Sequence, residues 1–184
     1  PCDVSVAEMV SAYSAFANHG IRTAPMFVSK IEDNEGNVIA TFQPRMNEVI
    51  SAESANKMLV LLQGVVDGGT ASRLRYKYHM EGQICGKTGT TNNNSDAWFI
   101  GFTPQLVTGI WVGGEDRDIH FDNMSMGQGA TMALPIWAYY MKKIYRDSSL
   151  GYSSKATFGL PEGFNPCGKQ DKEDDDFQID DIYE

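Results

Sequence analysis

The chain has 184 residues, of which 42% are hydrophobic and 21% charged, and its formal net charge at pH 7 is −9. These values are typical of one soluble globular domain that buries a real core. A membrane span is not predicted, because no apolar run approaches the roughly 18 residues that one needs. A nucleic-acid-binding role is also excluded, since it requires a basic face and the sequence shows none.

The first half of the chain predicts two helices and a hairpin. Apolar residues recur at helical spacing over residues 4–19, where Ser5 can cap the start of a helix and Glu8 can complete a capping box. Residues 26–43 read as a β-hairpin that turns at Asp33-Asn34-Glu35-Gly36-Asn37. A second helix is predicted from about Ala52 to Val66, with Ser51 as its cap.

The second half predicts three strands and a final helix. The strands cover 83–90, 97–102 and 106–112, and their short connections favour antiparallel neighbours. Residues 130–146 read as a helix whose regular part begins at Pro135, with Leu134, Ile136, Trp137 and Tyr140 on its apolar face. The predicted class is α+β, an antiparallel sheet flanked by helices.

We divide the chain into a domain at 1–149 and an acidic, mobile tail at 150–184. The tail holds nine acidic residues and three lysines. Because the first residue is Pro1 and a helix opens almost at once, we expect the chain to be a piece of a longer polypeptide.

Cysteines and histidines give no metal-ligand spacing, so neither a metal site nor a cofactor is predicted. Cys85 lies in an apolar run and is expected to be a small buried hydrophobe. Cys2 and Cys167 could form a disulfide in an oxidising compartment, which the sequence alone leaves open.

The stretch QICGKTGTT, residues 83–91, carries the strongest chemical signal. A phosphate-binding P-loop would need G-x-x-x-x-G-K-[ST] opening a helix, but Gly82 and Gly86 are one residue too close together and GTTNNNS opens helices poorly. As a strand, the stretch places the Thr88 and Thr90 hydroxyls on one face, about 7 Å apart. With the bare Gly89 and the cation of Lys87, this pattern suits an extended peptide that ends in a carboxylate. A surface strand with a solvated lysine is the alternative.

K-T-G is one of three motifs of penicillin-binding proteins and serine β-lactamases, together with S-x-x-K and S-x-N. GKTGTTNNNSDAWFIGFTP followed by LVTGIWVGG resembles the transpeptidase domain of class A penicillin-binding proteins. LLQGVVDGGTASRL, ALPIW and VSVAEMVSAYSAFANHGIRTAP resemble it too, so the likeness covers about residues 3–146. It implies serine acyl transfer on peptidoglycan stem peptides, and covalent inhibition by β-lactams.

The resemblance also implies roles for five residues. Lys87 would set the field around the nucleophile, and the Thr90 N–H would donate to the oxyanion. Thr88 and Thr90 would bind the substrate carboxylate through their hydroxyls, and Gly89 would keep the strand open to the substrate. Thr91 and the asparagines after it would form the turn at the rim of the cleft, with a direct substrate role for Thr91 as the weaker hypothesis.

Ser54-Ala-Asn-Lys57 matches S-x-x-K but is interpreted as part of a helix surface. Ser54-Ala-Asn56 also matches S-x-N, but one segment cannot supply two motifs that come from different walls of a cleft. The family also places both serine motifs far upstream of K-T-G. We therefore expect the isolated chain to be inactive. A serine β-lactamase or D,D-carboxypeptidase, and a non-catalytic peptidoglycan- or partner-binding module, remain the alternatives.

Class A membership implies further partners and a location. These are the rest of the transpeptidase domain, an upstream glycosyltransferase domain and a membrane anchor in the full-length protein, at the periplasmic or extracytoplasmic face of the bacterial inner membrane.

Asp96, Trp98 and Phe99 are expected to serve turn capping and packing, and Trp111 and Trp137 to lie in a core between sheet and helix.

Overall fold

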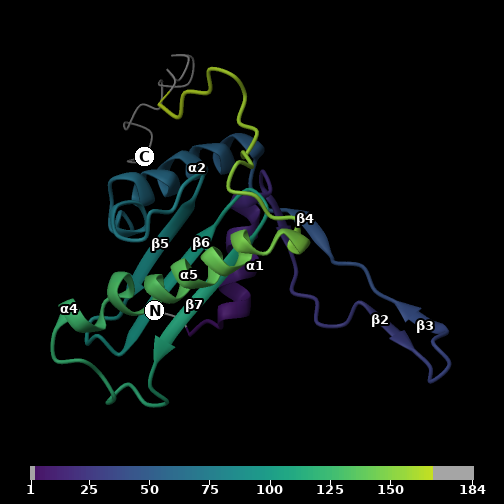
Figure 1. Cartoon of the computed structure of the whole chain (residues 1–184), viewed down its shortest axis with the longest axis horizontal. Coiled ribbons are helices and arrows are strands. Elements are labelled where there is room, and N and C mark those ends of the chain that lie inside the picture. The colour runs from purple at the N-terminus through teal and green to yellow at the C-terminus, as the bar shows by residue number, and fades with distance from the viewer. Residues whose placement is uncertain (1–2, 168–184) are drawn as a thin grey trace, which may run out of the picture.

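The computed structural model describes residues 3–167, and its helices and strands form an α+β domain with a projecting hairpin (Figure 1). The elements are α1 (Val6–Ala17), β1 (Ile21–Thr23), β2 (Lys30–Glu32), β3 (Val38–Thr41), β4 (Met46–Glu48), α2 (Ala52–Asp67), α3 (Arg73–Tyr76), β5 (Cys85–Thr90), β6 (Asp96–Phe102), β7 (Val107–Gly113), α4 (Met124–Gly127), α5 (Gly129–Arg146) and a 3-10 turn (Ser148–Leu150).

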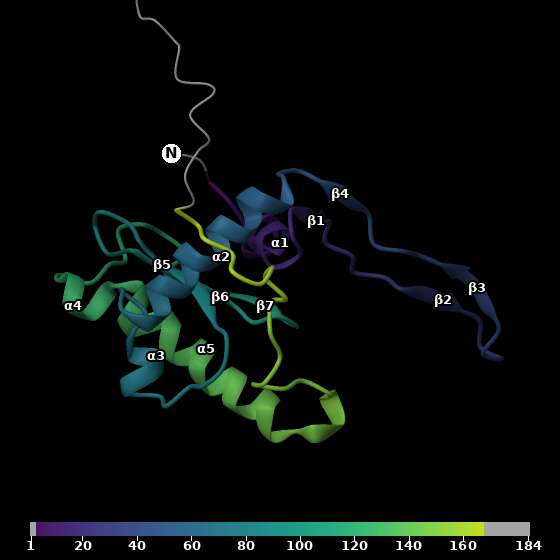
Figure 2. The same cartoon turned by 90° about the horizontal axis from the view of Figure 1, so that it is seen from above.

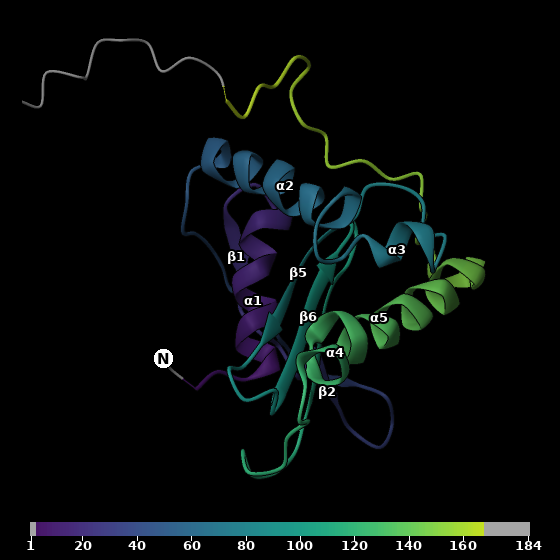
Figure 3. The same ribbon diagram turned by 90° about the vertical axis from the view of Figure 1, so that its left-hand side faces the viewer.

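The central sheet has the order β5-β6-β7, and both pairs of strands are antiparallel, as the short connections predicted. Figure 3 shows α5 on one face of this sheet and α1 on the other, with α2 crossing at the end where β5 begins. The predicted fold class is confirmed. None of the described helices is long and apolar enough to cross a membrane.

The caps that the sequence predicted are in place. The Ser5 hydroxyl accepts a hydrogen bond from the Glu8 N–H at 3.2 Å, and the Glu8 carboxylate accepts the Ser5 N–H at 2.8 Å. This is a complete capping box, which satisfies two N–H groups that would otherwise lack partners. At α2, the Ser51 hydroxyl accepts from the Ser54 N–H. Both helices therefore begin within two residues of the predicted positions.

Helix α5 covers nearly the predicted residues, but it differs from its prediction in where its regular part begins and in which residues it buries. It begins at Gly129 and continues through Pro135, because Gln128 already accepts hydrogen bonds from the next turn and fixes the first helical residues. Trp137 is fully buried, as predicted, whereas Ile136 and Tyr140 are 48% and 41% exposed. The buried face is made of Ala133, Leu134, Trp137, Ala138 and Met141.

The predicted hairpin forms from β2 and β3 and extends away from the body of the domain (Figure 2). Its turn is held by Asp33, whose carboxylate accepts from the N–H groups of Glu35 and Asn37. Two short strands that the sequence did not predict, β1 and β4, pair at the base of this hairpin.

Two hydrophobic clusters lie on opposite faces of the central sheet. The first packs Phe99 against Trp137 beneath α5, and the second packs Phe102 against Leu59 of α2. Phe158 belongs to the second cluster and is only 5% exposed. Phe158 falls within the predicted tail, and its ring contributes to the core. The acidic residues from 171 onward, and Cys2, lie outside the described residues, and the division at residue 149 stays a prediction.

Candidate active-site strand

The K-T-G residues lie on β5, the outer strand of the central sheet. Cys85 and Gly86 at its start are buried, whereas Lys87 and Thr90 are exposed. Within residues 3–167, the only strand paired with β5 is β6, so no strand covers the opposite edge of β5. An uncovered edge presents backbone N–H and C=O groups to which an extended peptide can add.

Thr88 and Thr90 lie on one face of β5, as the alternation predicted, and it is the face that α5 covers. Thr88 is paired with Phe99, which is buried beneath α5. The Thr88 hydroxyl oxygen is 2.8 Å from the hydroxyl oxygen of Thr70, in the loop between α2 and α3. The Thr90 hydroxyl accepts a hydrogen bond of 3.1 Å from the N–H of Gly129. Both hydroxyls are thus fixed by neighbours from other elements.

Lys87 lies on the opposite face of the strand. It is paired with Ile100 and shares its face with Cys85, whose thiol donates to the carbonyl of Leu59 in α2. The ammonium group donates to the carbonyl oxygen of Thr88 at 2.7 Å. The cation and the two hydroxyls therefore meet at the edge of β5 from opposite sides of the sheet.

The backbone N–H of Thr90 is directed to the uncovered edge. Thr91 donates its N–H to the carbonyl of Asp96, on the side of β6. Because successive N–H groups of a strand point to opposite edges, the N–H of Thr90 points away from β6. A donor in this place could stabilise a negative oxygen that develops on a substrate bound along the edge.

Gly89 makes room for neighbouring protein atoms. A Cβ atom at this position would lie 3.0 Å from the Cβ of Trp98 on the paired strand. On the other face, Gly129 approaches so closely that its own Cβ would be 2.6 Å from the Gly89 carbonyl oxygen. The absence of a side chain at Gly89 therefore makes room for Trp98, and its absence at Gly129 lets α5 approach β5.

Cys85 is a buried hydrophobe, as predicted. Its side chain is fully buried. Burial, and secondarily the negative charge of Asp67, raise its pKa to about 12 against a small opposing effect of Arg75. A thiol with such a pKa stays protonated at neutral pH and is not a nucleophile.

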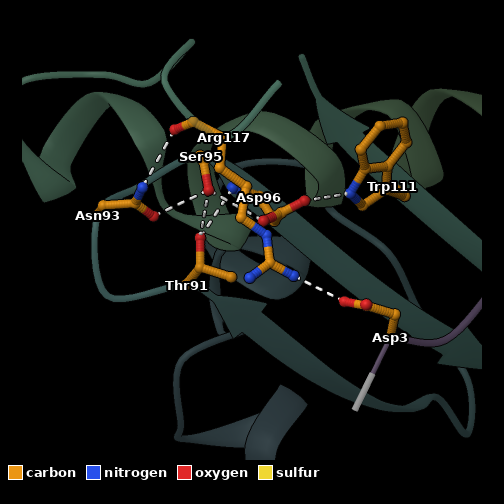
Figure 4. Close-up of polar contacts among 7 residues, drawn as sticks. All are labelled: Asp3, Thr91, Asn93, Ser95, Asp96, Trp111 and Arg117. Atoms are coloured by element: carbon orange, nitrogen blue, oxygen red, sulfur yellow. Dashed lines mark hydrogen bonds and ion pairs between the residues drawn. The ribbon is translucent and has the colours of Figure 1, made fainter. Parts of the chain in front are cut away.

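The turn after K-T-G is closed by a network around Asp96 (Figure 4). The Asp96 carboxylate accepts from the indole N–H of Trp111 at 2.9 Å and from the Ser95 hydroxyl at 3.0 Å. The Thr91 hydroxyl accepts from the Asp96 N–H and lies 3.0 Å from the Ser95 hydroxyl. Asp96 thus caps the turn, as predicted, and Thr91 borders a pocket of about 330 Å³ beside Trp98 and Trp111.

The electrostatics of this network favour a charged Asp96. Partial burial works to raise the pKa of its carboxyl, but hydrogen bonds from Trp111, Ser95 and Thr91, together with the charge of Arg117, outweigh it and lower the pKa below 3.8.

Trp111 is 40% exposed, so the prediction that it lies in a core between sheet and helix is wrong. Its indole N–H reaches the turn instead.

The run of asparagines holds the long loop between β7 and α4. Asn93 donates its side-chain amide to the carbonyl of Arg117, and Asn94 donates to the carbonyl of Phe121. Asn94 also adopts a positive φ of 58°, a conformation that asparagine tolerates better than most residues. This explains why polar, turn-forming side chains follow the K-T-G strand.

Ser54 and Lys57 do not form an activated serine. The Ser54 hydroxyl accepts from the hydroxyl of the cap residue Ser51, and the Lys57 ammonium pairs with Glu53 at 2.7 Å. Asn56 is buried and its side chain contacts His19. Ser54 and Lys57 thus lie on a helix surface, as interpreted, whereas Ala55 and Asn56 between them are buried.

Residues 2–146 match the family model described as the penicillin binding protein transpeptidase domain. The chain belongs to this family. Among curated penicillin-binding transpeptidases, penicillin-binding protein 1A of Aquifex aeolicus is 38% identical over 144 residues, which is 78% of this chain and 19% of that protein. Penicillin-binding protein 1A of Neisseria lactamica is 39% identical over 143 residues, 73% of this chain and 17% of that protein.

Solved penicillin-binding proteins have the same fold. Penicillin-binding protein 1A of Haemophilus influenzae superposes with a TM-score of 0.75 at 27% identity, covering 86% of this chain and 28% of that one. The penicillin-binding protein PonA1 of Mycobacterium tuberculosis gives 0.66 at 26% identity, covering 82% and 39%. The chain spans less than a fifth of the length of the A. aeolicus and N. lactamica proteins that it matches.

Proposed function

We propose that this chain forms the K-T-G side of the catalytic cleft in a class A penicillin-binding protein, a D,D-transpeptidase that crosslinks peptidoglycan stem peptides. The observation that carries the proposal is the uncovered edge of β5. Along it, Lys87 is exposed and the N–H of Thr90 is directed outward. Family membership over residues 2–146 supports the same reaction class.

In this reaction a serine hydroxyl attacks the D-Ala–D-Ala amide carbonyl, and the terminal D-Ala leaves as an amine that takes up the proton. The amine of a second stem peptide then attacks the resulting ester, which forms the crosslink and restores the serine. A β-lactam acylates the same serine. Lys87 would hold the local positive field, and the Thr90 N–H would stabilise the oxyanion of each tetrahedral intermediate.

The substrate carboxylate would be bound by the hydroxyls of Thr88 and Thr90, while the backbone of β5 adds to the extended peptide. Thr91 would border the cleft at its rim. We expect the nucleophile to come from a segment outside this chain, since the Ser54 hydroxyl accepts from the cap residue Ser51 and Lys57 is paired with Glu53. The isolated chain is then inactive.

The partners of the longer protein follow from this assignment. They are stem peptides, β-lactams, the remainder of the transpeptidase domain and a glycosyltransferase domain. Its place would be the extracytoplasmic face of a bacterial inner membrane.

A fluorescent penicillin tests the proposal in two arms. The isolated chain is expected to take no covalent label. A chimera in which this chain replaces the matching segment of the A. aeolicus protein is expected to be labelled at its S-x-x-K serine. Lys87→Ala in the chimera should slow labelling by on the order of 100-fold, whereas Lys30→Ala on the projecting hairpin should not. Labelling of the isolated chain, or equal labelling of both lysine variants, would contradict the proposal.

A further inference from the structure

Thr70 contributes a hydroxyl to the site from outside the K-T-G strand. Its oxygen is 2.8 Å from the hydroxyl oxygen of Thr88, a hydrogen-bond distance. Thr70 is exposed, and Thr88 is half-buried. The contact therefore lies at the surface of the domain, on the face of β5 where Thr90 also presents its hydroxyl.

The loop that carries Thr70 is held rigidly on both sides. Gly69 packs so closely on the end of α2 that a Cβ there would lie 2.8 Å from the Cα of Val65. Ala71 is fully buried and donates its N–H to the carbonyl of Val65. Arg73, two residues on, donates to the carbonyl of Ala130 at 3.3 Å. The position of the Thr70 hydroxyl is thus fixed by packing, and its approach to Thr88 is built into the fold.

Proton counting sets the direction of the hydrogen bond when an anion is bound. A threonine hydroxyl has one proton to donate and two lone pairs to accept. If Thr88 donates its proton to a carboxylate, it can only accept from Thr70. Thr70 then donates to Thr88, and Thr88 donates to the anion. A chain of hydroxyls aligned in this way polarises its last member and strengthens its bond to the anion.

We propose that Thr70 is a positioning residue for the anionic end of the substrate: it fixes the Thr88 hydroxyl and directs its proton to the carboxylate. This inference rests on the proposed function. A positioning role can be distinguished from a purely structural one. If Thr70 only connected the loop to the sheet, its loss would affect all ligands alike. A positioning role affects ligands that carry the anion.

The test uses the chimera described above and two probes, benzylpenicillin and its methyl ester, which lacks the negative charge. Thr70→Val, which keeps the shape and removes the hydroxyl, should slow acylation by benzylpenicillin about tenfold and leave acylation by the ester unchanged. Thr70→Ser should restore the rate. In a Thr88→Val background, Thr70→Val should cause no further loss, since its effect passes through Thr88.

Ser72→Ala is the matched control, because Ser72 lies on the same loop and its hydroxyl caps no helix; its rates should equal those of the parent. Thermal unfolding of every variant reports folding. If Thr70→Val slows both probes equally, or slows neither, the inference is wrong while the proposed function stands. If neither probe labels the parent chimera, both the proposed function and the inference fail.

Discussion

Gly129, the first residue of α5, packs its backbone against the backbone of Gly89 in the K-T-G strand. A Cβ at Gly129 would lie 2.6 Å from the Gly89 carbonyl oxygen and would also collide with the carbonyl of Trp98. The N–H of Gly129 donates to the Thr90 hydroxyl. The start of α5 and the outer strand of the sheet are therefore set at a fixed distance by one glycine.

We predict that Gly129→Ala destabilises the chain by about 1–3 kcal/mol, because the added methyl group meets backbone atoms that cannot give way. Chemical denaturation measures the change. Gly64→Ala is the control: a Cβ there meets no atom within 4 Å, and the helix interior of α2 favours alanine over glycine. It should stabilise by about 0.5–1 kcal/mol. Equal effects of the two substitutions would argue against the close contact.

Phe158→Ala should cost about 3 kcal/mol of unfolding free energy, because the ring is buried against Phe102 with their centroids 5.9 Å apart. The N–H of Phe158 also donates to the Gln83 side chain. Phe27→Ala is the matched control, since Phe27 is 88% exposed and its loss should change stability by less than about 0.5 kcal/mol. If both variants unfold alike, the chain around Phe158 does not contribute to the core.

Cys85 should resist alkylation near neutral pH in the folded chain while the exposed Cys167 reacts, as mass spectrometry of iodoacetamide-treated protein would show. The raised pKa also predicts a pH dependence. The folded thiol stays protonated until about pH 12, whereas the unfolded thiol ionises from about 9.0. Its contribution to stability is complete below 9.0 and is lost as the pH rises toward 12. Cys85→Ala should remove this dependence between 9.0 and 12.

Asp96 has a lowered pKa, so its charged form is favoured in the folded state. Its contribution to stability is present above 3.8 and is lost as the pH falls below that value. The indole N–H resonance of Trp111 reports on the same carboxylate through their 2.9 Å hydrogen bond. We expect this resonance to titrate with a midpoint below 3.8. In Asp96→Asn the titration should vanish, and a midpoint above 3.8 in the parent would show that the network does not hold the charge.

The long periodic elements were predictable because their caps are local. Ser5 and Ser51 mark the starts of α1 and α2 within the sequence itself. The short polar connections between the three strands of the central sheet mark where these strands end. The strands β1 and β4 were not predicted. Each has only three residues, too few to show an alternation of polar and apolar side chains, and the two strands are separated in the sequence by the whole β2–β3 hairpin. The regular first turn of α5, before Pro135, escaped prediction because Gly129 is placed by contact with β5 and not by a local signal.

The same distinction applies to the candidate site. That Thr88 and Thr90 share a face follows from alternation along one strand. That Thr70 meets Thr88 across 18 residues, and that Gly129 meets Thr90 across 39, depends on tertiary packing, which no motif encodes. Sequence reasoning therefore found the strand but not the residues that orient its hydroxyls. GGTASRL contributed to the family resemblance without indicating a role for Thr70.

The two faces of β5 carry different parts of the site, and this has a consequence for drug resistance. The hydroxyls that would recognise the acidic group of an antibiotic are held by the loop at Thr70 and by the first turn of α5, whereas the lysine lies across the sheet. Under the proposed function, we expect substitutions that weaken β-lactam recognition to collect around Thr70, where they can act without altering Lys87 on the opposite face of the strand.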